Sequence, residues 1–145
     1  MMFRAVFLAA FCVAAASACT QQISPCDGFT GTATNLKITT DVPFDSLKKG
    51  DTYKMTLEYD LPAPITKGHD IVKGTLSGIP VVNQDDNLCD DLSAAKPSCP
   101  VPAGHVVQVF DASISSDTPS GTLDATSTWT DDGKDILCIH TTICV

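Results

Sequence analysis

Six of the seven cysteines fall into three close pairs, and this spacing constrains the fold more than any other feature of the sequence. The pairs are seven, ten and six positions apart: Cys19 with Cys26, Cys89 with Cys99, and Cys138 with Cys144. An even set of cysteines in an exported chain is typical of a disulfide framework, for which six cysteines allow fifteen pairings. If the first and last strands run antiparallel, the outer pairs bond across in nested order, Cys26–Cys138 inside Cys19–Cys144. Cys89–Cys99 then closes a loop of its own.

Residues 1–18 have the organisation of a cleaved signal peptide. Arg4 provides a positive charge, residues 5–16 are apolar, and residues 16–18 (Ala-Ser-Ala) have the small-x-small form of a signal-peptidase site. Cleavage there removes the seventh cysteine and leaves residues 19–145, enough for one domain with a core of its own. A lipoprotein acylated on Cys19 is the alternative. We therefore expect an exported chain, either secreted or delivered to an endolysosomal or vacuolar lumen.

The charge of residues 19–145 excludes several classes of partner. Arg4 is the sole arginine among nine basic residues, so the remaining chain carries eight lysines against 17 acidic residues, a formal net charge of −9. A chain this acidic suits neither a phosphate backbone nor an anionic membrane surface. We therefore expect a soluble monomer with no nucleic-acid partner.

The clearest local pattern lies in residues 51–60, DTYKMTLEYD. Tyr53, Met55, Leu57 and Tyr59 alternate with polar residues, and this period of two places them on one face of a strand, toward an apolar interior. No ten-residue stretch has helical periodicity. The segments with strand-like composition, separated by turn residues, are 29–40, 51–60, 67–76, 81–82, 105–114, 122–130 and 136–144. They predict an all-β chain, an antiparallel sandwich of about seven strands.

Residues 87–104 interrupt this series of strands. Cys99 is followed by Pro100 and Pro102, which lack the N–H donors that a central strand needs. A disulfide from Cys89 to Cys99 would stabilise the loop by about 3 kcal/mol through chain entropy. We expect a stapled loop at a sheet edge or end, between two halves of the β-structure.

The sequence lacks the common motifs of catalysis and metal binding. It contains no GxSxG, HExxH, CxxC or Walker motif, and His69, His105 and His140 are scattered without partners at metal-ligand spacing. The Asp-rich turns at 85–86 and 131–133 have donors that calcium prefers, but such turns are usually only turns. A Ser–His–Asp set assembled only in the fold, and with it a hydrolase, stays open. We therefore predict no catalytic residue, no metal, no cofactor and no enzymatic activity.

Three segments, in order, resemble the MD-2-related lipid-recognition (ML) domain family. They are VKGTLSGIPV at 72–81, NLCDDL and SCPVPAG within 87–104, and PSGTLDATSTWTDDGKDILCI at 119–139. The family includes the lysosomal sterol-transfer protein of the Niemann-Pick C2 type and fungal phosphatidylglycerol/phosphatidylinositol transfer proteins. The landmarks match in order over nearly all of residues 19–145: an early Cys, an apolar–Gly–Pro turn, a Cys…Cys-Pro loop, and a Trp strand ending at a hairpin before a late Cys.

The resemblance implies an immunoglobulin-like sandwich whose sheets are splayed apart around an apolar cavity for one lipid. It implies the bonds Cys26–Cys138 and Cys89–Cys99, whereas Cys19–Cys144 is an addition to the family pattern. Segments 79–82 and 114–118 would frame the mouth, where Asn83 and Thr118 replace the bulky groups of sterol-binding members. The candidate lipid contacts are Leu57, Tyr59, Ile79, Val81, Phe110, Ile114, Leu123 and Trp129.

The function implied by the resemblance is binding and transfer of one sterol or phospholipid, with transient membrane contact. The segment 72–81 is most similar to the Niemann-Pick C2-type members and favours a sterol or mixed lipid. An extracellular recognition module or effector that presents lipid to a receptor, without transfer, is the alternative. A third possibility is a structural sandwich without a pocket, because large apolar side chains suit a packed core as well as a cavity.

Overall fold

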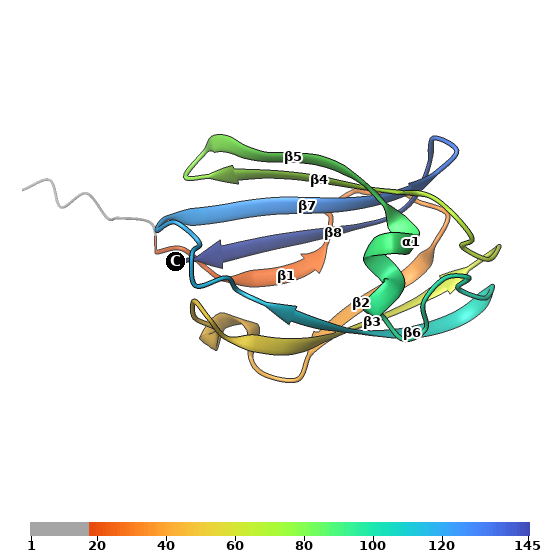
Figure 1. The fold of residues 1–145 in the computed structure, drawn as a ribbon, viewed down its shortest axis with the longest axis horizontal. Helices are drawn as coiled ribbons and strands as arrows, with labels where there is room; N and C mark the ends of the chain where they lie inside the picture. Colours follow the sequence, from red (N-terminus) through yellow and green to blue (C-terminus); the bar gives the residue numbers. More distant parts are fainter. Residues whose placement is uncertain (1–17) are drawn as a thin grey trace, which may run out of the picture.

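The structure, a computed structural model, describes residues 18–145, which form a sandwich of two antiparallel β-sheets (Figure 1). The five-stranded sheet has the order β1-β8-β7-β4-β5, and the three-stranded sheet the order β2-β3-β6. The strands are β1 (Gln22–Pro25), β2 (Thr34–Thr40), β3 (Thr52–Leu61), β4 (His69–Leu76), β5 (Ile79–Asn87), β6 (Gly104–Ser113), β7 (Thr122–Asp131) and β8 (Lys134–Cys144). The predicted all-β sandwich is confirmed, with eight strands. The predicted signal peptide lies outside the described residues except for its last residue, Ala18.

Strand β3 supplies the core face of the three-stranded sheet because its apolar side chains alternate. Leu57 and Tyr59 are 0% exposed, and the Tyr59 ring lies edge-on to Trp129 of β7, with ring centroids 6.2 Å apart. Strand β3 pairs along its whole length with β6, from Thr52 opposite Ser113 onward. The main core therefore lies between β3 and β6 of one sheet and β7 and β8 of the other.

The stapled loop joins the two sheets. It leaves β5, an edge of the five-stranded sheet, forms the short helix α1 (Leu88–Asp91) and a 3-10 turn, η2 (Leu92–Ala94), and returns as β6, an edge of the three-stranded sheet. Asn87 caps α1, since its side-chain oxygen accepts a hydrogen bond from the backbone N–H of Asp90 at 3.1 Å. Leu88 and Leu92 are buried in the main core. The loop is thus part of the core as well as a connection at the sheet edges.

Helical structure is otherwise confined to a second 3-10 turn, η1 (Phe44–Ser46), within residues 18–145. Phe44 packs with Leu47 and Ile114 in a small second core. Across the part of the chain that the structure describes, none of the helices has the length and apolar character needed to cross a membrane.

All three disulfides pair as predicted: Cys19–Cys144, Cys26–Cys138 and Cys89–Cys99. The first two flank the ladder between β1 and β8, in which Gln22 pairs with Thr142 and Pro25 with Ile139. Because β1 and β8 are antiparallel, an early cysteine meets a late one, and the two bonds nest.

The prediction missed one strand and shortened another, and β2 begins at Thr34, five residues later than the predicted 29–40. Strand β1 was not expected, because four residues that include Pro25 are too few to show a period of two. Strand β5 was expected only at 81–82 but continues to Asn87 through the polar residues Asn83, Gln84 and Asp85–Asp86. These residues are exposed because β5 is an edge strand, and polar side chains on an edge strand hide the strand signal while protecting the edge from aggregation.

Candidate functional site

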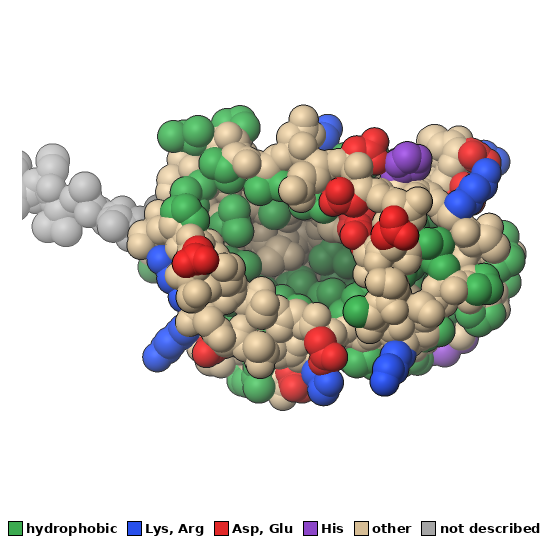
Figure 2. All heavy atoms as spheres, viewed as in Figure 1, with side chains coloured by type: hydrophobic (Ala, Val, Ile, Leu, Met, Phe, Trp, Pro, Cys, Tyr) green, Lys and Arg blue, Asp and Glu red, His purple; other side chains and the backbone are tan. Residues whose placement is uncertain are grey.

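The two sheets diverge between the edge strands β5 and β6, and a hollow opens there. Figure 2 shows this hollow on the face where β5 and β6 are in front, with hydrophobic side chains inside it and acidic ones beside it. Its inner part, which we call the inner hollow, has a volume of about 250 Å³. It is lined by Ile23, Tyr53, Met55, Asp70, Asp91, Leu92, Phe110, Ser127, Trp129, Ile139 and Thr141.

A second hollow lies farther along the same sheet, near the β4–β5 hairpin. This outer hollow has a volume of about 360 Å³ and an almost wholly apolar surface. It is lined by Leu76, Val81, Val82, Ser115, Asp117, Thr118, Pro119 and Leu123. The two segments predicted to frame a cavity mouth, 79–82 and 114–118, therefore both contribute to this hollow.

One row of inward-facing residues connects the two hollows. Across the five-stranded sheet, Val82 pairs with Gly74, Gly74 with Ala125, and Ala125 with Thr141. Val82 lines the outer hollow and Thr141 lines the inner one. The two residues between them are glycine and alanine, so almost no side chain rises from the sheet there. The inner face of the five-stranded sheet therefore carries very little side-chain volume between the two hollows.

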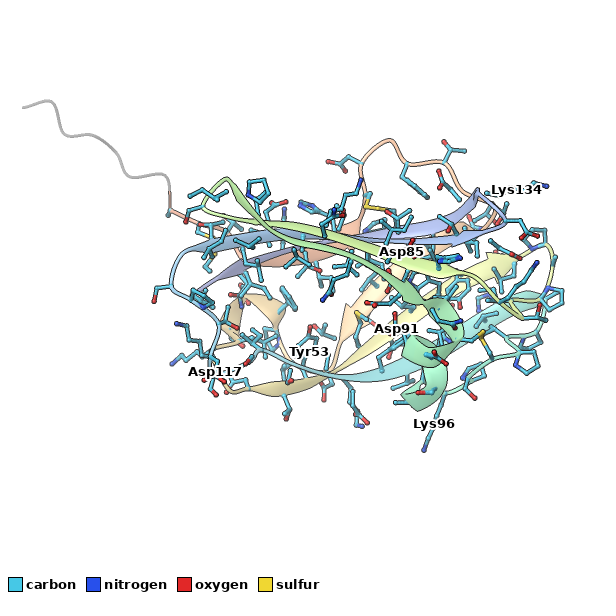
Figure 3. All side chains as sticks on the ribbon, turned by 45° about the horizontal axis from the view of Figure 1, so that its top comes forward. Tyr53, Asp85, Asp91, Lys96, Asp117 and Lys134 are labelled. Atoms are coloured by element: carbon cyan, nitrogen blue, oxygen red, sulfur yellow. A yellow bond between two sulfur atoms is a disulfide. The ribbon has the colours of Figure 1, made fainter. Side chains whose placement is uncertain are left out.

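The inner hollow carries polar groups on one wall. Asp70 of β4 points inward beside Trp129, its cross-strand neighbour on β7, and its Oδ1 accepts a hydrogen bond from Ser127 Oγ at 2.7 Å. Burial raises the pKa of Asp70, and the nearby carboxylates of Asp91 and Asp86 raise it further. Burial likewise raises the pKa of Asp91. Figure 3 shows Asp91 and Tyr53 at the gap between the two sheets.

The eight candidate lipid contacts occupy five different environments. Phe110 and Trp129 line the inner hollow, with ring centroids 6.3 Å apart, and Leu123 and Val81 line the outer one. Leu57 and Tyr59 lie in the closed core, and Ile114 in the small second core. Ile79 is 68% exposed at the tip of the β4–β5 hairpin. The role of each as a lipid contact stays a prediction.

Sequence reasoning missed several residues that line the hollows. Ser127 lies two residues before Trp129 on the same strand, so a period of two places both side chains on the inner face. Its small polar side chain did not mark it as a candidate lipid contact. Asp70 has the inward parity of β4, but the apolar residues of 69–76 fall on both parities and do not show which face is inside. Residues 88–95 carry no period at all, which is why Asp91 and Leu92 were not expected at the site.

A further hollow of about 330 Å³ lies at the opposite edge of the sandwich, beneath the 26–33 loop and the start of β2. It is lined by apolar side chains, threonines, Asn35 and the Cys26–Cys138 disulfide, with no charged side chain. It has neither the charged side chains that line the inner hollow nor a cross-strand row of small residues like Gly74 and Ala125.

The three histidines lie at outward-facing positions and contact carboxylates. His69 Nδ1 lies 2.7 Å from Asp85, His105 Nδ1 lies 2.8 Å from Asp60, and His140 Nε2 lies 3.0 Å from Asp124. Within residues 18–145, no serine side chain bonds to any of them. The same residues contain no group of three His, Cys, Asp or Glu side chains placed to hold a metal ion.

The ML domain family model matches residues 20–145, nearly the whole described chain. The chain belongs to the ML domain family. A solved structure with the same fold is that of a Niemann-Pick type C2 protein from the Japanese carpenter ant, with a TM-score of 0.57 and 13% sequence identity over 83% of this chain and 96% of that one. A search of curated proteins finds no significant match. This ML domain is thus a member of a lipid-binding family, and the immunoglobulin-like sandwich is confirmed.

Proposed function

We propose that this ML domain binds one lipid between its two sheets, with the acyl chain or sterol body lying across Gly74 and Ala125. The observation that carries the proposal is the row from Val82 to Thr141, which has a lining residue of each hollow at its two ends and almost no side chain between them. A sheet face selected only for a solid core would fill this row with larger side chains.

The size and surface of the two hollows support this proposal. Small-molecule sites have volumes of about 300–1,000 Å³ and mostly apolar walls, and the two hollows together fall within that range. Removal of a sixteen-carbon chain from water contributes about 12 kcal/mol, at about 0.8 kcal/mol per CH₂, before the costs of ordering. Such a ligand needs few hydrogen bonds, and its binding involves no catalytic step.

The exposed β4–β5 hairpin favours transfer of the lipid over permanent storage. Val81, 53% exposed, lines the outer hollow, and Ile79, 68% exposed, lies two residues before it at the tip of the hairpin. Lys49 lies near the rim of the outer hollow, where its Nζ donates to Ser120 at 3.3 Å. A rim with apolar and cationic groups suits transient contact with a membrane. We propose a secreted or lumenal carrier of a sterol or phospholipid, for which three disulfides suit an oxidising compartment.

A single substitution in the row of inward-facing residues between the two hollows tests the proposal. Ala125→Phe places a ring in this row, and we expect it to abolish lipid binding. Thr126→Phe is the matched control, because the next residue on β7 points to the outer face. Native mass spectrometry of the purified proteins, followed by extraction, measures bound lipid, and far-UV circular dichroism checks the fold.

The outcomes are distinct. We expect lipid on the wild type and on Thr126→Phe and none on folded Ala125→Phe. A wild type that carries no lipid, as purified and after incubation with sterol-containing phospholipid vesicles, would refute the proposal, as would full binding by Ala125→Phe. Movement of bound lipid between vesicles separates a carrier from a module that only presents lipid to a receptor.

A further inference from the structure

The polar groups of the cavity gather at one end. The outer hollow is apolar apart from its rim, whereas the wall of the inner hollow includes the carboxyl groups of Asp70 and Asp91 and the hydroxyl of Ser127. An amphiphile that fills both hollows therefore has one favourable orientation, with its polar group near α1 and its apolar part toward the β4–β5 hairpin.

The charge at this end is negative and has no counter-ion from residues 18–145. Asp70 is half-buried, Asp86 faces it from β5, and Asp91 faces it from α1. The ion pairs within residues 18–145 involve none of these three carboxylates. Lys73 is near Asp70 along β4 but has the opposite parity, so its side chain points to the outer face.

Asp70 is also fixed in position. Ser127 Oγ donates to Oδ1 at 2.7 Å, and Asp70 lies beside Trp129, which closes the inner hollow. A carboxylate held on a half-buried wall, with low local dielectric and no cation nearby, interacts strongly with a cationic group that enters. An ammonium group satisfies this site, a hydroxyl group satisfies its hydrogen bond without the charge, and a carboxylate is repelled.

We propose that the cavity selects single-chain amphiphiles with an ammonium head group, which Asp70 binds, and discriminates against fatty carboxylates. This proposal rests on the proposed binding of one lipid between the sheets and, within that function, favours a single-chain ammonium amphiphile over the sterol or phospholipid that the family resemblance implies. Asp91 and Asp86 add attraction over a longer distance, and the chain of the ligand lies over Gly74 and Ala125.

Three probes with the same chain and different heads test the proposal: hexadecylamine, hexadecanol and palmitate. Trp129 is the only tryptophan of the chain and lines the inner hollow, so its fluorescence reports binding directly. Titrations at neutral pH, below the micelle concentrations, should give affinities in the order amine, alcohol, carboxylate. We expect about a tenfold advantage for the amine over the alcohol, the factor that one charge-assisted hydrogen bond provides.

Two isosteric variants then test whether the preference for the amine comes from the charge of Asp70. Asp70→Asn keeps an acceptor for Ser127 and removes the charge, and we expect it to lose the tenfold preference for the amine over the alcohol. Asp85→Asn is the control, because Asp85 lies on the outer face of β5, next to His69. It removes the same charge and should keep the preference.

The result separates this proposal from the proposed function. If palmitate binds as tightly as hexadecylamine, or if Asp70→Asn keeps the wild-type preference, the head-group proposal is wrong while lipid binding stands. If none of the three probes changes Trp129 fluorescence and no lipid is extracted from the protein, the lipid-binding function itself is wrong.

Discussion

At the scale of single residues, Tyr59, Gln108 and the backbone of Pro97 form a hydrogen-bonded chain inside this ML domain. Tyr59 Oη donates to Gln108 Oε1 at 2.7 Å, and Gln108 Nε2 donates to the Pro97 carbonyl at 2.7 Å. Gln108 is 0% exposed. A buried amide is tolerated only when its hydrogen bonds are made, and here they tie β3 and β6 to the stapled loop. Burial also raises the pKa of Tyr59, so its hydroxyl stays protonated as a donor.

Tyr59→Phe removes the donor and leaves Gln108 Oε1 unpaired. We expect the free energy of unfolding to fall by about 1–3 kcal/mol, the cost of an unsatisfied buried acceptor, while lipid binding is retained because Tyr59 lines neither hollow. Urea unfolding followed by circular dichroism measures the change. Tyr53→Phe is the control, since none of the hydrogen bonds within residues 18–145 uses its hydroxyl, and we expect a loss below about 0.5 kcal/mol. Equal losses in the two variants would contradict this role of Gln108.

At the scale of elements, the ability of the sequence to predict the fold follows from where each strand lies. Strand β3 is half-buried, so its alternation was visible, and the nested disulfides followed from the antiparallel course of the first and last strands. Strand β5 is a polar edge strand, and its residues 83–87 show no apolar pattern in the sequence. Strand β1 is too short for a period. The strands that were missed or shortened are thus the two outermost strands of the five-stranded sheet.

The candidate site was less predictable than the fold, for a physical reason. Leu57 and Trp129 have the same pattern whether two sheets pack tightly or leave a cavity, since either arrangement needs inward-facing apolar residues. Whether a cavity exists depends on the divergence of β5 from β6, which no local pattern encodes. The clue that the sequence does contain is the small pair Gly74 and Ala125, which becomes meaningful only when the register places them side by side.

The disulfides make a prediction about elements that can be tested in pairs. In a background that already lacks Cys19–Cys144, loss of Cys26–Cys138, which then closes 112 residues, should destabilise the domain more than loss of Cys89–Cys99, which closes 10. Chain-entropy estimates give about 5 and about 3 kcal/mol, respectively, as upper values. Double Cys→Ser variants made in that background, unfolded in urea without reductant, measure the two losses. The reverse order would mean that the stapled loop stabilises the sandwich mainly by holding Leu88 and Leu92 in the core.

At the scale of the whole molecule, one end combines exposed apolar side chains with a lysine. The exposed residues Ile79 and Val81 and the nearby Lys49 belong to the end with the outer hollow, and Figure 2 shows lysines at that end. Asp117 also lines the outer hollow, acidic residues dominate the rest of the surface, and the net charge of residues 19–145 is −9. Long-range repulsion therefore opposes the approach to an anionic membrane, although the rim itself is suited to contact.

This balance predicts that lipid transfer to anionic vesicles increases as the pH falls from 7 to 5. The hydrogen bond to Asp60 raises the pKa of His105, and the Asp60 and Glu58 carboxylates support the shift, so His105 takes up its proton at a higher pH than an ordinary histidine. Because burial raises the pKa values of Asp70 and Asp91, these carboxyl groups begin to take up protons at a higher pH than ordinary ones. Each step makes the protein less negative and weakens repulsion from the membrane.

Transfer is measured by adding phosphatidylserine-containing vesicles to the lipid-loaded protein and following the return of Trp129 fluorescence to its lipid-free value. The same measurement with zwitterionic vesicles shows how much of the increase comes from faster release of lipid by the protein rather than from weaker repulsion. Transfer to anionic vesicles that stays flat or falls toward pH 5 would mean that surface charge does not control the encounter.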